Sequence, residues 1–220
     1  MPTPPRTSLD EIVRAGRDVL DREGLDAVTM QRVASIVGVR APSLYKRVRD
    51  RDALVRLIAE AVLADLGAAL SGAVTLGDPA AEPSAAVTTS NPTGDPAAEP
   101  SGSVTTGDPA ADLRAIAIAF RAWALLHPGG FGLLFARLPD ALRLEADPRS
   151  EAIEPVLRTV AALTGPDRAL DASRMVVAWA SGFVSMELAG TFQLGGDVDA
   201  AFAFGIERLA AAIALPQPAR

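Results

Sequence analysis

The sequence contains no cysteine, a single histidine and few aromatic residues, and each shortage excludes a kind of chemistry. Without cysteine there is no disulfide, thiolate metal site or cysteine nucleophile. One histidine, His127, cannot supply a multi-histidine metal site or a two-histidine mechanism. The chain also lacks a Gly-X-Ser-X-Gly elbow, a glycine-rich phosphate loop and a metal-spaced carboxylate cluster. We therefore expect a protein that is not an enzyme and that has no cofactor or metal.

Long uncharged apolar runs are also missing, although 49% of the 220 residues are hydrophobic. No stretch of 18 apolar residues without charge occurs, which argues against a spanning helix. The first residues have no apolar run and do not resemble a signal peptide. We expect a cytoplasmic protein of one or two domains, with enough apolar material for a core and no membrane partner.

Residues 71–109 differ in composition from the rest of the chain. They contain no Lys, Arg or aromatic residue, and 22 of the 39 are Pro, Gly, Ser or Thr. The phrase GDPAA occurs three times, starting at Gly77, Gly94 and Gly107. Because such repeats carry too little apolar area to offset chain entropy, we expect a disordered linker that grew by tandem duplication. A docking segment for a partner is the alternative.

The residues on either side of this segment show helical patterns. Residues 1–66 contain four predicted helices, the first beginning with a capping box formed by Ser8 and Glu11. Residues 110–215 contain five more, at about 112–127, 130–137, 148–164, 166–190 and 197–214, with Pro or Gly at each junction. No alternating strand pattern occurs. The fold class is therefore predicted to be all-α, with about nine helices.

One stretch of the N-terminal part is cationic although the protein as a whole is acidic. Residues 38–56 contain six basic and two acidic residues, while the whole chain has a net charge of −6. A short helix, a turn at Gly38 and a second short helix match helix-turn-helix spacing. The second helix is apolar on one side only, and its other side presents cations and hydroxyls suited to major-groove contact. A solvated helix face is the alternative explanation of this charge.

The stretch VTMQRVASIVGVRAPSLYKRVRDRDALV resembles the DNA-binding domain of tetracycline-repressor-type (TetR/AcrR) transcriptional regulators. The resemblance covers about residues 8–66. One departure is that many members have His-Phe where this chain has Arg47-Val48. A second resemblance involves Trp123, His127, Pro128 and Gly129, which are similar to the Trp-His-Gly signature of one TetR-type C-terminal ligand-binding domain. The inserted segment 71–109 is a further departure from the family pattern.

The resemblance implies a homodimeric, ligand-responsive repressor of palindromic operator DNA. Dimerisation would use the two last helices, about 166–190 and 197–214, and a small apolar or amphipathic effector would release the DNA. Arg49 is treated as a solvated charge, and Tyr45 could pack instead of contacting phosphate. The positions that match DNA-contacting ones are Thr29, Gln31, Arg40, Ala41, Ser43, Tyr45, Lys46, Arg47 and Arg51.

The C-terminal part offers weaker candidates for effector binding. His127 could instead cap a helix end or pack beside an aromatic ring, and Trp123 needs a partner for its indole N–H. A face of the long helix at 166–190 could be core, subunit interface or pocket wall. Arg121 and Glu187 lie in apolar helices and must pair or face solvent. The predicted effector contacts are Trp123, His127, Phe131, Trp179 and Phe183.

Two other classes of function remain to be weighed against a repressor. An enzyme is disfavoured by the missing motifs. An interaction module whose helix-turn-helix no longer binds DNA is favoured only by the modest local charge.

Overall fold

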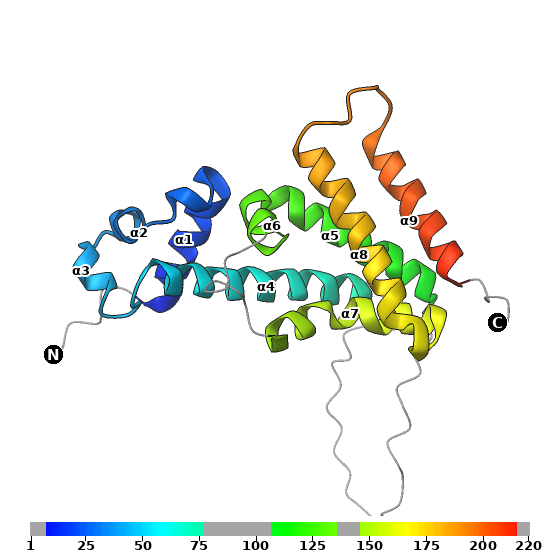
Figure 1. Cartoon of the computed structure of the whole chain (residues 1–220), viewed down its shortest axis with the longest axis horizontal. Coiled ribbons are helices and arrows are strands. Elements are labelled where there is room, and N and C mark those ends of the chain that lie inside the picture. The colour runs from blue at the N-terminus through cyan, green and yellow to red at the C-terminus, as the bar shows by residue number, and fades with distance from the viewer. Residues whose placement is uncertain (1–7, 77–106, 136–145, 215–220) are drawn as a thin grey trace, which may run out of the picture.

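The computed structural model describes residues 8–76, 107–135 and 146–214, with side chains for all of these except 75, 76 and 146–150. Within these ranges the chain forms nine α-helices, one short 3-10 helix and no strand (Figure 1). The predicted all-α fold is therefore confirmed, and no predicted C-terminal helix boundary is off by more than three residues.

Four helices and a 3-10 turn form the N-terminal unit. They are α1 (Leu9–Glu23), η1 (Leu25–Ala27), α2 (Met30–Val37), α3 (Ala41–Leu44) and α4 (Arg51–Leu76). The predicted capping box is present, because the Glu11 N–H donates to Ser8 Oγ and the Ser8 N–H donates to the Glu11 carboxylate. Gly38 ends α2 in the left-handed region at φ +76°, a conformation that a residue with a Cβ rarely adopts. The unit packs around Ile12, Leu44 and Leu54, which are fully buried.

Helix α4 is longer than the sequence indicated. It runs for 26 residues and places buried Leu66 and Leu70 against the C-terminal helices. The predicted linker boundary is therefore wrong at this end, since residues 71–76 belong to α4. Residue Asp108 caps α5, so the linker prediction for 107–109 is wrong as well. Residues 77–106 lie outside the described ranges. Burial of Leu70 explains the extension, because tertiary packing stabilises a helix that weak local propensity would not.

The C-terminal unit consists of α5 (Pro109–Leu126), α6 (Pro128–Phe135), α7 (Ala146–Thr164), α8 (Pro166–Leu188) and α9 (Val198–Ala214). In Figure 1, α4 lies beside α5 and α7, while α8 and α9 stand together at the end far from α3. Helix α6 packs against α1 and α4. The α5–α6 corner is therefore where the two units meet.

No single helix in the described ranges is long and apolar enough to cross a membrane. The pair α5 and α6 passes that test only when taken together, and the two helices are bent by 109° relative to one another.

Candidate functional site

Six of the nine residues predicted to contact DNA are exposed on one surface, which is formed by α2, α3 and the turn that follows α3. Leu44 and Val48 point into the core, and this orients the intervening residues outward. Ala41 is half-buried at the start of α3. The exposed members of the predicted set are Gln31, Arg40, Ser43, Tyr45, Lys46 and Arg47. The structure therefore brings these six side chains together on one surface, while their contacts with DNA stay a prediction.

The cations of this surface are not neutralised by the protein. Among the described residues, no carboxylate forms an ion pair with Arg40, Lys46 or Arg47. Arg49 differs, because its Nε donates to the Asp50 carboxylate at 2.6 Å. Three unpaired cations on one short segment create a local positive potential.

Two members of the predicted set also hold the local fold. Thr29 Oγ1 accepts a hydrogen bond from the Arg32 N–H at 3.1 Å and so caps α2. Arg51, at the start of α4, donates to the carbonyl oxygens of Val28 and Leu25, both at 2.8 Å. Sequence reasoning missed this bracing role, because it joins residues 23 and 26 positions apart. Phosphate contact by Arg51 stays a prediction.

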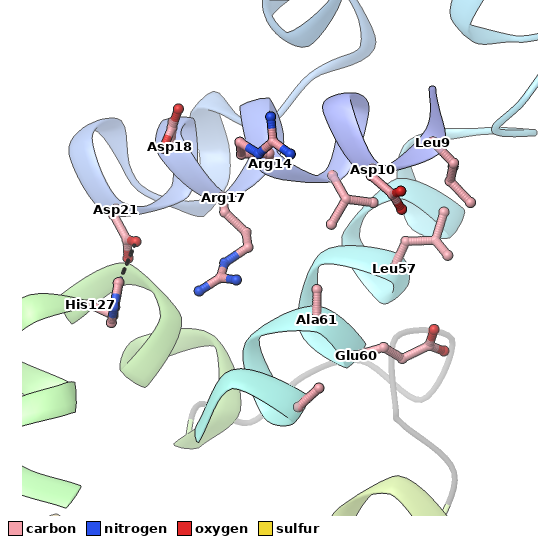
Figure 2. A pocket seen from close by; sticks show the side chains of 12 residues that line it. Leu9, Asp10, Arg14, Arg17, Asp18, Asp21, Leu57, Glu60, Ala61 and His127 are labelled. Carbon is pink, nitrogen blue, oxygen red and sulfur yellow. Dashed lines mark hydrogen bonds and ion pairs between the residues drawn. The ribbon is translucent and has the colours of Figure 1, made fainter. Parts of the chain in front are cut away.

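Trp123 and His127 lie at the junction between the two units. The Trp123 indole N–H donates to Asp65 Oδ2 on α4 at 3.0 Å, which supplies the partner that the sequence analysis required. His127 Nδ1 lies 3.3 Å from Asp21 Oδ2 on α1 (Figure 2). The second oxygen of Asp21 accepts from the Gly130 N–H at 2.9 Å, at the start of α6. These side chains therefore connect α5 and α6 to the helices of the N-terminal unit.

The junction carries a shared carboxylate. Arg17 on α1 donates to the same Asp65 oxygen as Trp123, at 2.7 Å. Burial by itself would raise the pKa of Asp65, but the hydrogen bonds from Trp123 and Arg17, and the charges of Arg17 and His127, outweigh it. The net effect lowers the pKa. Sequence reasoning did not identify Asp65, Asp21 and Arg17 as members of this junction. The one available signal in the sequence was that the Trp123 indole N–H needs a hydrogen-bond partner.

An open groove of about 580 Å³ lies beside this junction, between α1 and α4 (Figure 2). Its lining mixes four acidic side chains, Asp10, Asp18, Asp21 and Glu60, with Arg14, Arg17, His127 and apolar residues. His127 is the only predicted effector residue that lines it.

A separate apolar cavity of about 60 Å³ lies between α4 and the C-terminal helices α5, α6, α7 and α8. None of the five predicted effector residues lines it. Phe131 is nevertheless its neighbour, because it packs on both Phe120 and Phe135, with ring centroids 6.1 and 4.8 Å away. The lining residues are Leu66, Leu70, Leu113, Ile116, Ala117, Phe120, Phe135, Ile153, Val156, Val176, Val177 and Ala180.

Trp179 and Phe183 pack instead between α8 and α9. Both rings lie 5.1 Å from the ring of Phe202, which is fully buried. Arg121 lies over Phe202 and donates to both oxygens of Glu187 and to Asp199. Of the two alternatives for Arg121 and Glu187, the structure shows pairing. The hydrogen bonds that Arg121 donates to Glu187 are the main reason that the pKa of Arg121 is raised, so this side chain stays positively charged.

The outer face of α8 is exposed and partly apolar. Met175 and Met186 are 44% and 49% exposed, and Ala178, Gly182 and Ser185 lie between them on that face. On α9, Phe204 is 61% exposed. The exposed face of α8 therefore carries Met175 and Met186, whereas Trp179 and Phe183 on the same helix are half-buried against α9.

The described part of the chain has no group of three His, Cys, Asp or Glu side chains that could hold a metal ion.

The comparisons with known proteins agree on one family. The family model "Bacterial regulatory proteins, tetR family" matches residues 12–58, and "Tetracyclin repressor-like, C-terminal domain" matches residues 113–209. Over 59 residues the chain is 36% identical to tetracycline repressor protein class E of Escherichia coli, a match spanning 27% of this chain and 28% of that protein.

Two further similarities extend over nearly the whole chain, one in sequence and one in fold. An uncharacterized HTH-type transcriptional regulator of Mycobacterium tuberculosis is 28% identical over 215 residues, which cover 94% of this chain and 82% of the relative. A solved structure of a protein with unknown function from Rhodococcus sp. RHA1 shares the fold with a TM-score of 0.72, at 20% identity and with 97% of each chain covered. The chain belongs to the TetR family of transcriptional regulators.

Proposed function

We propose that the protein is an effector-responsive repressor that binds palindromic operator DNA as a homodimer in the cytoplasm. The observation that carries this proposal is the α2–α3 surface, where Arg40, Lys46 and Arg47 are exposed and have no ion-pair partner among the described residues. Leu44 and Val48 anchor this surface to the core, so its side chains are presented from a fixed backbone. Fixed cations and hydroxyls on and directly beside a short helix, here α3 and the turn that follows it, are suited to phosphate contact and to base-edge readout.

Operator binding is tested by fluorescence anisotropy with DNA from upstream of the protein's own gene. Lys46→Ala should weaken binding by about 1 kcal/mol or more, or at least about fivefold, because a base or phosphate contact is lost. Arg158→Ala is the matched control, since Arg158 is an exposed arginine on α7, away from the α2–α3 surface. Equal effects of the two substitutions would contradict the assignment of the surface. Absence of binding by the unmodified protein would favour an interaction module.

The proposed dimer uses the exposed outer faces of α8 and α9. Small residues at 178, 182 and 185 allow another helix to approach closely, and the flanking methionines supply apolar area. A two-fold symmetric pairing of this face would place two DNA-binding units side by side, as a palindromic site requires.

Sedimentation velocity tests the dimer. Ala178→Glu should shift the protein towards monomer, because it buries a charge at the proposed interface. Ala162→Glu is the matched control, as Ala162 is exposed on α7. A dimer that survives Ala178→Glu would exclude this interface.

The proposed effector is small and mostly apolar, and it occupies the cavity between α4, α5, α7 and α8. This cavity touches α4, which also starts in the DNA-binding unit, so an occupant could favour one orientation of that unit over another. To release the operator, the effector must bind the non-binding arrangement more tightly than the DNA-binding one. A tenfold loss of operator affinity requires about 1.4 kcal/mol of that preference.

A further inference from the structure

The α5–α6 corner places the one imidazole of the chain between two carboxylates of the N-terminal unit. His127 Nδ1 lies 3.3 Å from Asp21 Oδ2 on α1, and His127 Nε2 lies 3.9 Å from Asp65 Oδ2 on α4. The His127 side chain is 25% exposed and lines the open groove between α1 and α4 (Figure 2). A proton can therefore reach this imidazole from solvent while the two units stay in contact.

The two carboxylates differ in the partners that they already have. Asp65 Oδ2 accepts from the Trp123 indole N–H at 3.0 Å and from Arg17 at 2.7 Å, so a guanidinium already offsets its charge. Asp21 accepts from the Gly130 backbone N–H, which carries no charge. In the described part of the chain, His127 is the only side chain paired with Asp21 that can become a cation. A neutral His127 therefore leaves one negative charge at the junction unbalanced.

The remaining charged groups around His127 have been considered helix by helix. Helix α6 has none among its eight residues, and Arg121 on α5 is bonded to α8 and α9 instead. The other charged side chains that line the groove are Asp10, Arg14 and Asp18 on α1 and Glu60 on α4. Since three of these four are carboxylates, the groove as a whole attracts a protonated imidazole.

Protonation changes what His127 can donate to its two neighbours. A neutral imidazole has one N–H, so one of its ring nitrogens presents a lone pair towards a carboxylate. The protonated ring has an N–H on both nitrogens, and its hydrogen bond to Asp21 becomes charge-assisted. Asp65, at 3.9 Å, is beyond hydrogen-bond distance but is attracted by the same charge. Protonation should therefore hold the α5–α6 corner more firmly against α1 and α4.

The backbone at this corner leaves little room for adjustment. A Cβ added at Gly129 would lie 2.2 Å from the Leu20 carbonyl oxygen, so the start of α6 rests directly on the backbone of α1. Helix α1 packs in turn on α2, which carries part of the predicted DNA-facing surface. The attraction across the junction therefore affects how firmly the DNA-binding unit is held in the described orientation.

We infer that the proton is a second effector of this protein, which binds His127, stabilises the described arrangement of the two units and makes operator affinity depend on pH. This inference rests on the proposed operator binding and adds a regulation that does not use the apolar cavity, since His127 does not line that cavity. Among side chains, only histidine ordinarily gains or loses its proton between pH 5 and 8, and this chain has one. By linkage, a proton that changes operator affinity must itself be taken up or released when the operator binds.

The first test measures the contact itself, without DNA. Urea unfolding of the full-length wild type, His127→Gln, Asp21→Asn and the double variant gives the coupling between the two side chains at about pH 6 and about pH 8. Gln retains a donor but cannot be protonated, and Asn retains an oxygen that can accept from the Gly130 N–H. The coupling, expressed as a factor in the unfolding equilibrium constant, should be about three- to tenfold larger at the lower pH. Equal coupling at both pH values would overturn the inference.

The second test measures operator affinity by fluorescence anisotropy over the same pH range. The affinity of the wild type should change by about threefold or more, and His127→Gln and Asp21→Asn should each remove most of this change. Asp167→Asn is the matched control, because it removes an exposed carboxylate on α8 and should retain the pH dependence of the wild type.

The outcomes separate this inference from the proposed function. The same pH dependence in the wild type and in His127→Gln would overturn the inference and leave operator binding intact. A wild type that binds no operator would reject the proposed function and the regulatory role of His127 together. A pH-dependent coupling in the first test would in that case support only the contact between His127 and Asp21.

Discussion

Gly129, at the start of α6, is where a single added methyl group should separate the two units. A Cβ at this position would lie 2.2 Å from the Leu20 carbonyl oxygen and 2.8 Å from the Asp21 Cα. Both are backbone atoms of α1, so no side chain can rotate away. Since ordinary contacts begin at 3.4 Å, α6 must move by roughly 1 Å relative to α1. The 2.9 Å hydrogen bond from the Gly130 N–H to Asp21 would then be lost.

The expected size follows from two opposing effects. Replacing glycine by alanine in a helix favours folding by up to about 1 kcal/mol. Overpacking of this kind costs about 1–3 kcal/mol, and the lost hydrogen bond adds about 1 kcal/mol. Gly129→Ala should therefore lower the free energy of unfolding by about 1–3 kcal/mol. Gly132→Ala on the same helix has no atom within 4 Å of the added Cβ and should be neutral or stabilising.

Urea unfolding followed by circular dichroism measures this difference, and anisotropy measures operator affinity on the same samples. If the contact orients the DNA-binding unit, Gly129→Ala also changes operator affinity under conditions where it is fully folded. Equal stability and equal operator affinity for the two variants would refute the reasoning about the junction.

Three further predictions concern other contacts. Gly205→Ala would place a Cβ 2.2 Å from the Trp179 ring and should destabilise the α8–α9 pair by about 1–3 kcal/mol. Gly132→Ala, with nothing within 4 Å of the added Cβ, should not, and urea unfolding monitored by tryptophan fluorescence checks the difference. Because the pKa of Asp65 is lowered in the folded protein, the stability that this carboxylate contributes is present above its unfolded-state pKa and is lost as pH falls through its folded-state pKa. Asp65→Asn should therefore be less stable than the wild type near neutral pH, and it should lose less stability between neutral and acid pH. Unfolding curves measured over a pH series test this, and parallel pH profiles for the two proteins would contradict it. Arg51→Ala should lower the free energy of unfolding by about 1–3 kcal/mol, because two hydrogen bonds to carbonyl oxygens are lost. Lys46→Ala should weaken operator binding without changing stability. Equal thermal midpoints of the two variants would contradict the bracing role of Arg51.

The features that sequence reasoning predicted well depend on local signals. The start of α1 is fixed by Ser8 and Glu11, three residues apart, and the end of α2 by Gly38, so both can be read from neighbouring residues. The α2–α3 surface followed because burial of Leu44 and Val48 determines which side of the segment is exposed.

The features that could not be predicted join residues far apart in the chain. Trp123 meets Asp65 across 58 positions, and Arg121 meets Glu187 across 66. Trp123 and His127 are likewise bonded to Asp65 on α4 and Asp21 on α1, because the bend at Pro128 turns the α5–α6 corner towards the N-terminal unit. The length of α4 was missed for the same reason, since Leu70 is stabilised by packing that its neighbours in sequence do not reveal.

Affinity selection of fragmented genomic DNA is the most direct test of operator binding through the α2–α3 surface. The full-length protein and an Arg40→Ala/Lys46→Ala variant are incubated in parallel with DNA from the source organism, and the retained fragments are sequenced. The account predicts that the wild type enriches a small set of fragments sharing a near-palindromic site and that the variant loses this enrichment. No enrichment by the wild type, or the same fragments retained by the variant, would contradict it.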